Sequence, residues 1–223
     1  MTSLTIPVEH GQLEAILKQP DDSPTGAALV CHPHPEHGGN MHNKVVYNTA
    51  KALRDLGFSV VRFNFRGVGA STGEYDQGLG ELEDAESVYD WMKQRHPEVP
   101  FIIGGFSFGS FIGLSVAERK PDVDAAIGVG LPLEMYDFSF LHEFDRPTLL
   151  IQGEHDEFAS FNELATFLTG KNKQITLRKI EGGDHFLKER YSSLKTVIMN
   201  WMSTGDGSAL MKTNPSTSGR GLP

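Results

Sequence analysis

Apolar residues recur along the chain in short runs with the period of strands and in longer segments with the period of helices. Alternating apolar and polar positions predict two strands, residues 4–8 and 13–18, joined as a hairpin by His10 and Gly11. Later runs rich in apolar residues predict six further strands, and the wholly apolar run at residues 27–31 is typical of a strand buried on both faces of a parallel sheet. These predicted strands are residues 27–31, 58–65, 101–103, 125–129, 147–152 and 174–180.

Segments with apolar residues at helical spacing separate these strands. The predicted helices are residues 45–56, 81–95, 111–119, 161–168 and 187–202. Regular alternation of strand and helix predicts an α/β fold with right-handed crossovers and a mostly parallel, doubly wound sheet that begins with the antiparallel hairpin. Residues 1–203 are expected to form a single domain. Residues 204–223 are rich in Gly, Ser, Thr and Pro and lack an apolar pattern, so we expect this tail to be disordered.

The composition of the chain indicates which binding partners and which cellular compartment to expect. The chain is 39% hydrophobic and 22% charged, and no apolar run is long enough to cross a bilayer, so we expect a soluble protein without a membrane partner. A formal net charge of −9 without a Lys/Arg cluster argues against sequence-independent binding of nucleic acid. The first residues lack the pattern of a secretory signal, and the single cysteine, Cys31, excludes an internal disulfide. Both observations favour a cytoplasmic protein.

One stretch combines a strand, a tight turn and a helix around a serine. Residues 105–109 read Gly-Phe-Ser-Phe-Gly, after a predicted strand and before a predicted helix. At so sharp a turn a Cβ two residues before or after Ser107 would collide with neighbouring backbone, which explains the two glycines. The pattern predicts a turn that presents the Ser107 hydroxyl as a nucleophile. The alternative is that Ser107 only caps the following helix.

An acid and a base follow later strands of the predicted sheet. Functional groups in parallel sheets gather after the carboxyl ends of the strands. Asp156 follows the strand at 147–152 and His185 follows the strand at 174–180. A serine hydroxyl needs an imidazole to take its proton, and the imidazole needs a carboxylate to fix its tautomer. We therefore predict Ser107 as nucleophile, His185 as base and Asp156 as the orienting acid.

Other residues compete for the roles of acid and base. The rival acids are Glu154, Glu157 and Asp137. The rival base is His155, but a catalytic pair of adjacent residues in one loop would leave His185 without a role. Asp156 and His185 are therefore the preferred pair.

The tetrahedral intermediate of acyl transfer needs two backbone N–H donors. Phe108, which follows the nucleophile, is one candidate. The other is expected in the loop at residues 32–39, where Pro33 and Pro35 have no N–H and His34 is left. We therefore predict an oxyanion hole formed by Phe108 and His34.

The same loop raises the question of a metal. Histidines stand at positions 32, 34, 37 and 42, but prolines separate the first three and only Glu36 adds a carboxylate at ligand spacing. The glycine-rich turn that starts at Arg66 fails the dinucleotide pattern because Thr72 stands where the third glycine belongs. We therefore predict neither a metal nor another cofactor.

With these motifs in place, residues 26–186 resemble the α/β-hydrolase superfamily. The chain is most similar to small bacterial hydrolases related to dienelactone hydrolases and carboxylesterases, which share the H-P-H-P-x-x-G-G loop at residues 32–39 and the R-G-x-G-x-S turn at residues 66–71. This chain has His-Pro where many relatives have His-Gly, and Ser107 where dienelactone hydrolases have cysteine. The resemblance implies a serine esterase that acts on small carboxylic esters. The alternative is a non-catalytic, partner-binding or peptidase-like member of the same fold.

Residues 130–146 bear on the size of the substrate. The superfamily commonly inserts a lid at this place, after the strand that follows the nucleophile helix, but this segment is too short for a multi-helix cap. Leu131, Met135 and Phe138 are candidates to line a small acyl pocket, the alternative being that they close the core. We therefore expect short-chain ester substrates. Whether the chain forms a homodimer is left open by the sequence.

Overall fold

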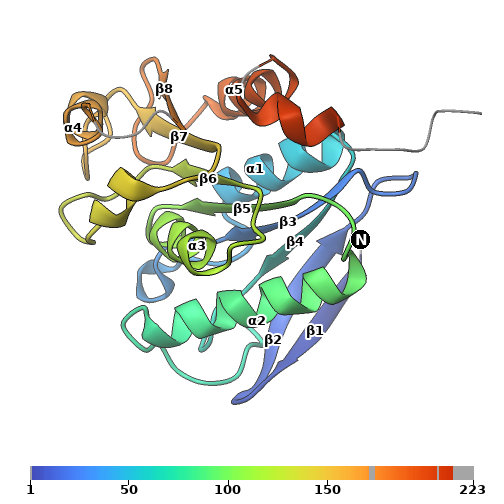
Figure 1. The fold of residues 1–223 in the computed structure, drawn as a ribbon. Helices are drawn as coiled ribbons and strands as arrows, with labels where there is room; N and C mark the ends of the chain where they lie inside the picture. The colour runs from blue at the N-terminus through green and yellow to red at the C-terminus, as the bar shows by residue number, and fades with distance from the viewer. Residues whose placement is uncertain (1, 171–173, 205, 213–223) are drawn as a thin grey trace, which may run out of the picture.

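The structure, a computed structural model, describes residues 2–170, 174–204 and 206–212. Within these residues an eight-stranded sheet has the order β1-β2-β4-β3-β5-β6-β7-β8 (Figure 1). The strands are β1 (Thr2–Val8), β2 (Gly11–Lys18), β3 (Gly26–Cys31), β4 (Phe58–Phe63), β5 (Phe101–Phe106), β6 (Ala125–Val129), β7 (Thr148–Gly153) and β8 (Ile175–Ile180). Strand β2 pairs antiparallel with β1 and β4, and the other pairs are parallel. The predicted mostly parallel sheet with an antiparallel start is confirmed.

Helices cover both faces of the sheet (Figure 1). Helices α1 (Lys44–Asp55) and α5 (Tyr191–Thr204) pack together on one face, and α2 (Leu79–Arg95) and α3 (Phe108–Arg119) on the other. The short α4 (Phe161–Phe167) and the 3₁₀ helices η1 (Pro35–His37) and η2 (Ser139–Glu143) lie in the connections, and a further 3₁₀ helix, η3 (Asp206–Lys212), follows α5. None of the helices in the described ranges is both long enough and apolar enough to cross a membrane.

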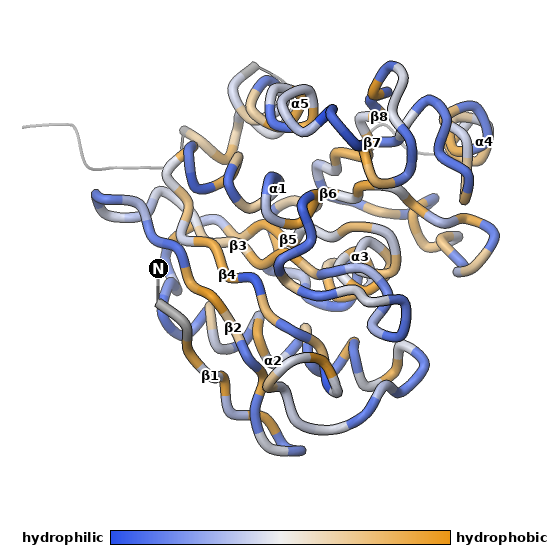
Figure 2. The backbone as a smooth tube through the Cα atoms, turned by 180° about the vertical axis from the view of Figure 1, so that it is seen from behind, coloured by the Kyte–Doolittle hydropathy of each residue, from blue (hydrophilic) through white to orange (hydrophobic). Residues whose placement is uncertain are grey.

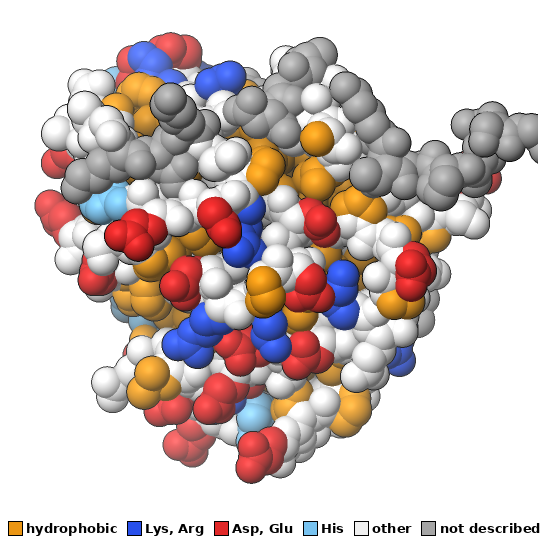
Figure 3. Space-filling view, viewed as in Figure 1, with side chains coloured by type: hydrophobic (Ala, Val, Ile, Leu, Met, Phe, Trp, Pro, Cys, Tyr) orange, Lys and Arg blue, Asp and Glu red, His pale blue; other side chains and the backbone are white. Residues whose placement is uncertain are grey.

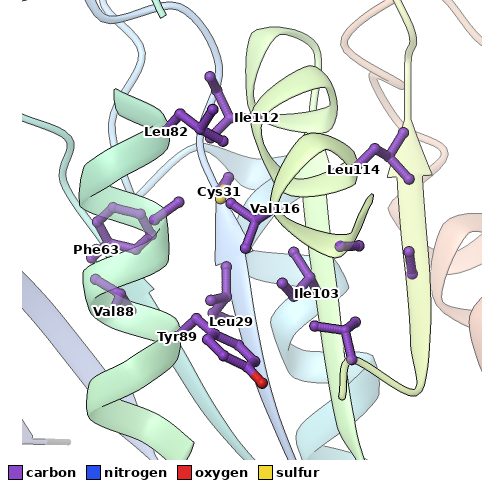
Figure 4. Close-up of a cluster of buried hydrophobic side chains, with 14 of the residues drawn as sticks. Leu29, Cys31, Phe63, Leu82, Val88, Tyr89, Ile103, Ile112, Leu114 and Val116 are labelled. Carbon is purple, nitrogen blue, oxygen red and sulfur yellow. The ribbon is translucent and has the colours of Figure 1, made fainter. Parts of the chain in front are cut away.

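The two faces of the sheet carry separate apolar clusters. Every residue of β3, β4, β5, β6 and β7 is buried, as expected for strands covered on both sides. Figure 4 shows the cluster under α2 and α3, where Leu29 and Ile103 of the sheet face Val88 of α2 and Val116 of α3. This packing fixes the end of β5 and the start of α3, where the candidate nucleophile lies.

Two predictions near the C-terminus were wrong. The last helix begins at Tyr191 and not at Leu187, because Leu187 and Glu189 have φ angles of 49° and 58°, which no α-helix accepts. Residues 206–212, expected to be disordered, form η3 on the surface of α5. Gly207 packs so closely that an added Cβ would lie 2.8 Å from the Trp201 ring. Of the rest of the predicted disordered tail, residue 204 ends α5, and residues 205 and 213–223 lie outside the described residues.

Candidate active site

Ser107 stands alone between β5 and α3, in a backbone conformation that is rare for a residue with a side chain. Its φ is 56° and its ψ is −126°. Its N–H donates to the carbonyl of Val129 at the end of β6, at 2.9 Å, which holds the turn against the sheet. Ser107 occupies the N-cap position of α3, but its side chain makes no capping hydrogen bond. The cap interpretation therefore fails, and the predicted strand–turn–helix is confirmed.

The glycines on either side of Ser107 have the predicted steric role. A Cβ on Gly105 would lie 1.9 Å from the carbonyl oxygen of Gly109. A Cβ on Gly109 would lie 2.5 Å from the carbonyl oxygens of Cys31 and His32. The turn can therefore close, and α3 can approach the end of β3, only with glycine at both positions.

The structure brings Ser107, His185 and Asp156 together in a chain of hydrogen bonds. Ser107 Oγ lies 3.0 Å from His185 Nε2, and His185 Nδ1 lies 2.9 Å from Asp156 Oδ2. A carboxylate only accepts hydrogen bonds, so Nδ1 carries the proton and the lone pair of Nε2 faces the serine hydroxyl. His185 is 2% exposed and Asp156 5%, so water competes little for the bond between them.

The rival acids and the rival base lie elsewhere. Glu154 forms an ion pair with Lys179 at 3.1 Å, and Asp137 accepts a hydrogen bond from the backbone of Ser139. The side chain of His155 is 72% exposed. None of these groups contacts Ser107 in the described residues.

Aromatic rings and a backbone hydrogen bond hold His185 in place. The ring of Phe106 lies 4.9 Å from the His185 ring and that of Phe158 lies 4.5 Å from it, centroid to centroid. Glu157, the remaining rival acid, accepts a hydrogen bond from the His185 backbone N–H at 3.3 Å. These contacts restrict rotation of the imidazole, so it stays directed at Ser107.

Gln152 is a supporting residue that the sequence reasoning missed. Its buried side chain accepts a hydrogen bond from the Leu131 N–H at 2.9 Å and donates one to the Ala159 carbonyl at 2.7 Å. It thereby joins the segment after β6 to the loop that carries Asp156. The signal in the sequence is an amide side chain at the end of an otherwise apolar run.

The two predicted oxyanion donors lie next to each other. Phe108 is the first residue of α3, so its N–H has no partner within the helix. The ring of His34 lies 5.2 Å from the ring of Phe108, which places the loop after β3 beside the start of α3. Neither N–H donates a hydrogen bond to another residue in the part of the chain that the structure describes. The Phe108 N–H therefore lies at the start of α3, at the positive end of the helix dipole, and the loop that carries His34 lies beside it.

His32 anchors the loop that carries His34. Its Nε2 accepts a hydrogen bond from the Phe65 N–H at 3.0 Å, so its Nδ1 carries the proton and donates to the Pro33 carbonyl at 2.6 Å. Burial lowers the pKa of His32 to about 4, against the weaker opposite effects of the Pro33 hydrogen bond and of Asp84. His32 is therefore neutral and links the loop to the end of β4.

The predicted acyl-pocket residues divide into two groups. Leu131 and Phe138 are 0% and 1% exposed, and the Phe138 ring packs edge-on against Phe111. These two side chains close the core, so the prediction that they line a pocket was wrong. Met135 is 48% exposed and is the one of the three that presents surface.

The fold and this geometry define a class of protein, and the family comparison agrees with it. A family model described as an alpha/beta hydrolase domain matches residues 28–211. The chain belongs to the alpha/beta hydrolase family, which confirms the resemblance inferred from the sequence.

Individual relatives support the same class. An uncharacterized protein of Rickettsia prowazekii is 36% identical over 204 residues, which cover 87% of this chain and 86% of that protein. The structure of an alpha-beta serine hydrolase homologue from Coxiella burnetii is similar with a TM-score of 0.84 at 36% identity, covering 89% of this chain and 96% of that one. A serine hydrolase without a lid from Xanthomonas campestris gives a TM-score of 0.82 at 33% identity, covering 90% and 93%. These similarities support hydrolase activity in this chain.

Proposed function

We propose that this protein is a serine esterase that hydrolyses short-chain carboxylic esters through an acyl-enzyme intermediate. The observation that carries the proposal is the unbroken hydrogen-bond chain from Ser107 through His185 to Asp156. Its members come from three separate strand ends, and the base is already in the tautomer that accepts the serine proton.

In the acylation step, Ser107 Oγ attacks the ester carbonyl carbon while His185 Nε2 takes the hydroxyl proton. The imidazolium that forms is stabilised by Asp156, which stays ionised. When the tetrahedral intermediate collapses, Nε2 returns the proton to the leaving alcohol. The acyl group then remains on Ser107 as an ester.

In the deacylation step, a water molecule takes the place of the alcohol. His185 removes its proton, and the hydroxide attacks the acyl carbon. Collapse of the second intermediate releases the carboxylic acid and returns the proton to Ser107 Oγ. In both steps we assign the backbone N–H groups of Phe108 and His34 to the oxyanion, because Phe108 follows Ser107, the ring of His34 lies against that of Phe108, and neither N–H has another acceptor among the described residues.

The preference for short acyl chains rests on what covers the site. Between β6 and β7 the described chain contains one 3₁₀ helix, Ser139–Glu143, and no cap of several helices. Leu131 and Phe138 are closed into the core, so this segment has little apolar surface left to bury a long chain. We therefore assign small, water-soluble esters as substrates.

Substitution of Ser107 and His185 tests the proposal. Ser107→Ala and His185→Ala should each lower kcat for p-nitrophenyl acetate by on the order of 10⁴-fold, and the double variant should lose little more, because the two residues act as a unit. His155→Ala, which removes an exposed histidine from the Asp156 loop, is the control and should keep full activity. Additive losses in the double variant would contradict a shared mechanism.

A further inference from the structure

A small cavity lies on the α1 face of the sheet, between α1 and the β2–β4 pair. Figure 2 shows the backbone of these three elements from behind. Its volume is about 70 Å³. The lining residues are Lys18, Tyr47, Ala50, Lys51, Arg54, Val60 and Arg62. Those from α1 recur at helical spacing, and the register of β2 with β4 puts Lys18 and Arg62 on one face of the sheet. Four of the seven lining side chains are cationic.

Arg62 is the most deeply buried of these cations, with 3% of its surface exposed. Its Nη1 donates to the Met41 carbonyl at 2.6 Å, and its guanidinium lies 5.2 Å from the centre of the Tyr47 ring. Among the described residues it has no ion pair. The carboxylate on the same face of β2, Glu14, accepts instead from Asn64 Nδ2 at 2.8 Å. Burying a charge without a counter-ion is costly. The described residues supply no counter-ion for this guanidinium, so a bound anion would stabilise it.

The surrounding charges increase this imbalance. Lys18 is half-buried and forms no ion pair with any described residue. Lys51 and Arg54 both contact Asp55, which also contacts Lys195. One carboxylate therefore serves several cations, and the cavity keeps a surplus of positive charge.

This arrangement differs from that on the opposite face of the sheet. On the face that carries α2 and α3, basic and acidic side chains are interspersed (Figure 3). Lys120 pairs there with Asp90, and Lys93 with Asp122. The whole chain has a formal net charge of −9. A cavity lined by four cations, of which only Lys51 and Arg54 have an ion-pair partner among the described residues, is an exception to this pattern.

We propose that this cavity binds the phosphate group of a small soluble phosphate monoester. A dianionic phosphate matches the surplus charge better than a carboxylate, and guanidinium groups bind phosphate oxygens through paired hydrogen bonds. Arg62 holds the phosphate from the inside, with Lys18, Lys51 and Arg54 around it. Tyr47, Ala50 and Val60 give apolar surface to the organic part. The site is separate from Ser107 and does not depend on the proposed esterase activity.

Calorimetric titration at constant ionic strength tests the proposal with two probes, inorganic phosphate and glycerol 3-phosphate. At about pH 7.5, where a phosphate monoester is dianionic, both should bind saturably and one-to-one, with a Kd of about 1 mM or tighter. Glycerol 3-phosphate should bind at least as tightly as inorganic phosphate. Acetate, with one charge, should bind more weakly than either.

Variants of the lining residues locate the binding. Lys18→Gln and Arg62→Gln should each weaken binding of both probes on the order of tenfold or more. Since Arg62 also holds Met41, Lys18→Gln decides the matter if Arg62→Gln does not fold. The control is Lys120→Gln, which makes the same change of charge on the opposite face and should bind as the wild type does. Ser107→Ala should also bind normally, so that a failure of the esterase proposal and a failure of this one are distinguishable.

Three results would overturn the inference. Binding that does not saturate means that no discrete site exists. An equal loss in Lys120→Gln and Lys18→Gln means that the effect follows net charge alone. Binding of inorganic phosphate without binding of glycerol 3-phosphate excludes a monoester as the ligand.

Discussion

Protonation of His32 should release the loop that carries His34. The neutral ring accepts a hydrogen bond from the Phe65 N–H through Nε2 and donates to the Pro33 carbonyl through Nδ1. A proton added at Nε2 would face the Phe65 N–H, and two donors cannot bond to each other. The ring is 0% exposed, so water cannot replace the lost acceptor unless the loop moves.

The size of this effect follows from the pKa of His32. Burial lowers that pKa from 6.5 to about 4. Between these values the unfolded chain binds the proton and the folded protein does not, so the free energy of unfolding falls as the pH falls. The contribution is complete above about pH 6.5 and is lost by about pH 4. The difference between the two pKa values corresponds to about 3 kcal/mol of unfolding free energy. About 2 kcal/mol of this should be lost when the pH falls to about 5.

Urea unfolding of the wild type and of His32→Gln, at about pH 7.5 and about pH 5, measures this contribution. The variant keeps an amide donor and acceptor but does not titrate. Its free energy of unfolding should be lower than that of the wild type at the higher pH, and the gap should shrink by about 2 kcal/mol at the lower pH. His155→Gln, which removes an exposed histidine, should show no such change in its gap. A gap for His32→Gln that is equal at both pH values would refute the reasoning.

Two further predictions concern the support of the site and the substrate. Gln152→Leu leaves the Leu131 N–H and the Ala159 carbonyl buried without partners, at a cost of about 1–3 kcal/mol each. We therefore expect the variant to have a lower melting temperature. We also expect a lower kcat for p-nitrophenyl acetate, because the loop that carries Asp156 loosens. Across p-nitrophenyl esters, kcat/KM should peak at about four acyl carbons or fewer, because an open site desolvates few methylenes and each is worth about 0.8 kcal/mol. A steady rise to about twelve carbons would reveal a deep acyl site.

The sequence predicted those features whose cause is local. The predicted strand at residues 125–129 has the same first and last residues as β6. A short, wholly apolar run of this length is typical of a buried strand. The position of Ser107 also has a local cause. Gly105 and Gly109, two residues before and after it, allow the tight turn that a Cβ at either position would block. His185 and Asp156 follow from the rule that functional loops come after strand ends.

Features that depend on distant neighbours could not be predicted. The roles of His32 and Gln152 arise from bonds to Phe65, Leu131 and Ala159. The sequence shows Gln152 as an amide at the end of an apolar run, but it does not show which residues these side chains bond. An apolar side chain such as Phe138 has the same appearance in a sequence whether it lines a pocket or closes a core.

The period of apolar residues also failed to predict the local conformation near the C-terminus. Leu187 is a good helix former and continues the apolar stripe of α5, but its positive φ places it in the turn that follows His185. Residues 206–212 are too few to show a period, and Leu210 and Met211 nevertheless pack against the cluster on the α1–α5 face. A short apolar segment becomes ordered when a preformed apolar surface lies within reach.

The central claim is that Ser107 is an activated nucleophile, and labelling with a fluorophosphonate tests it most directly. Such a probe forms a covalent bond with a serine oxygen only when a neighbouring base removes the hydroxyl proton and the oxyanion is stabilised. Mass spectrometry of the digested protein should find one adduct, on Ser107, and His185→Ala should lose it while remaining folded. Folded wild-type protein with Ser107 unmodified, or with the adduct on another serine, would contradict the account.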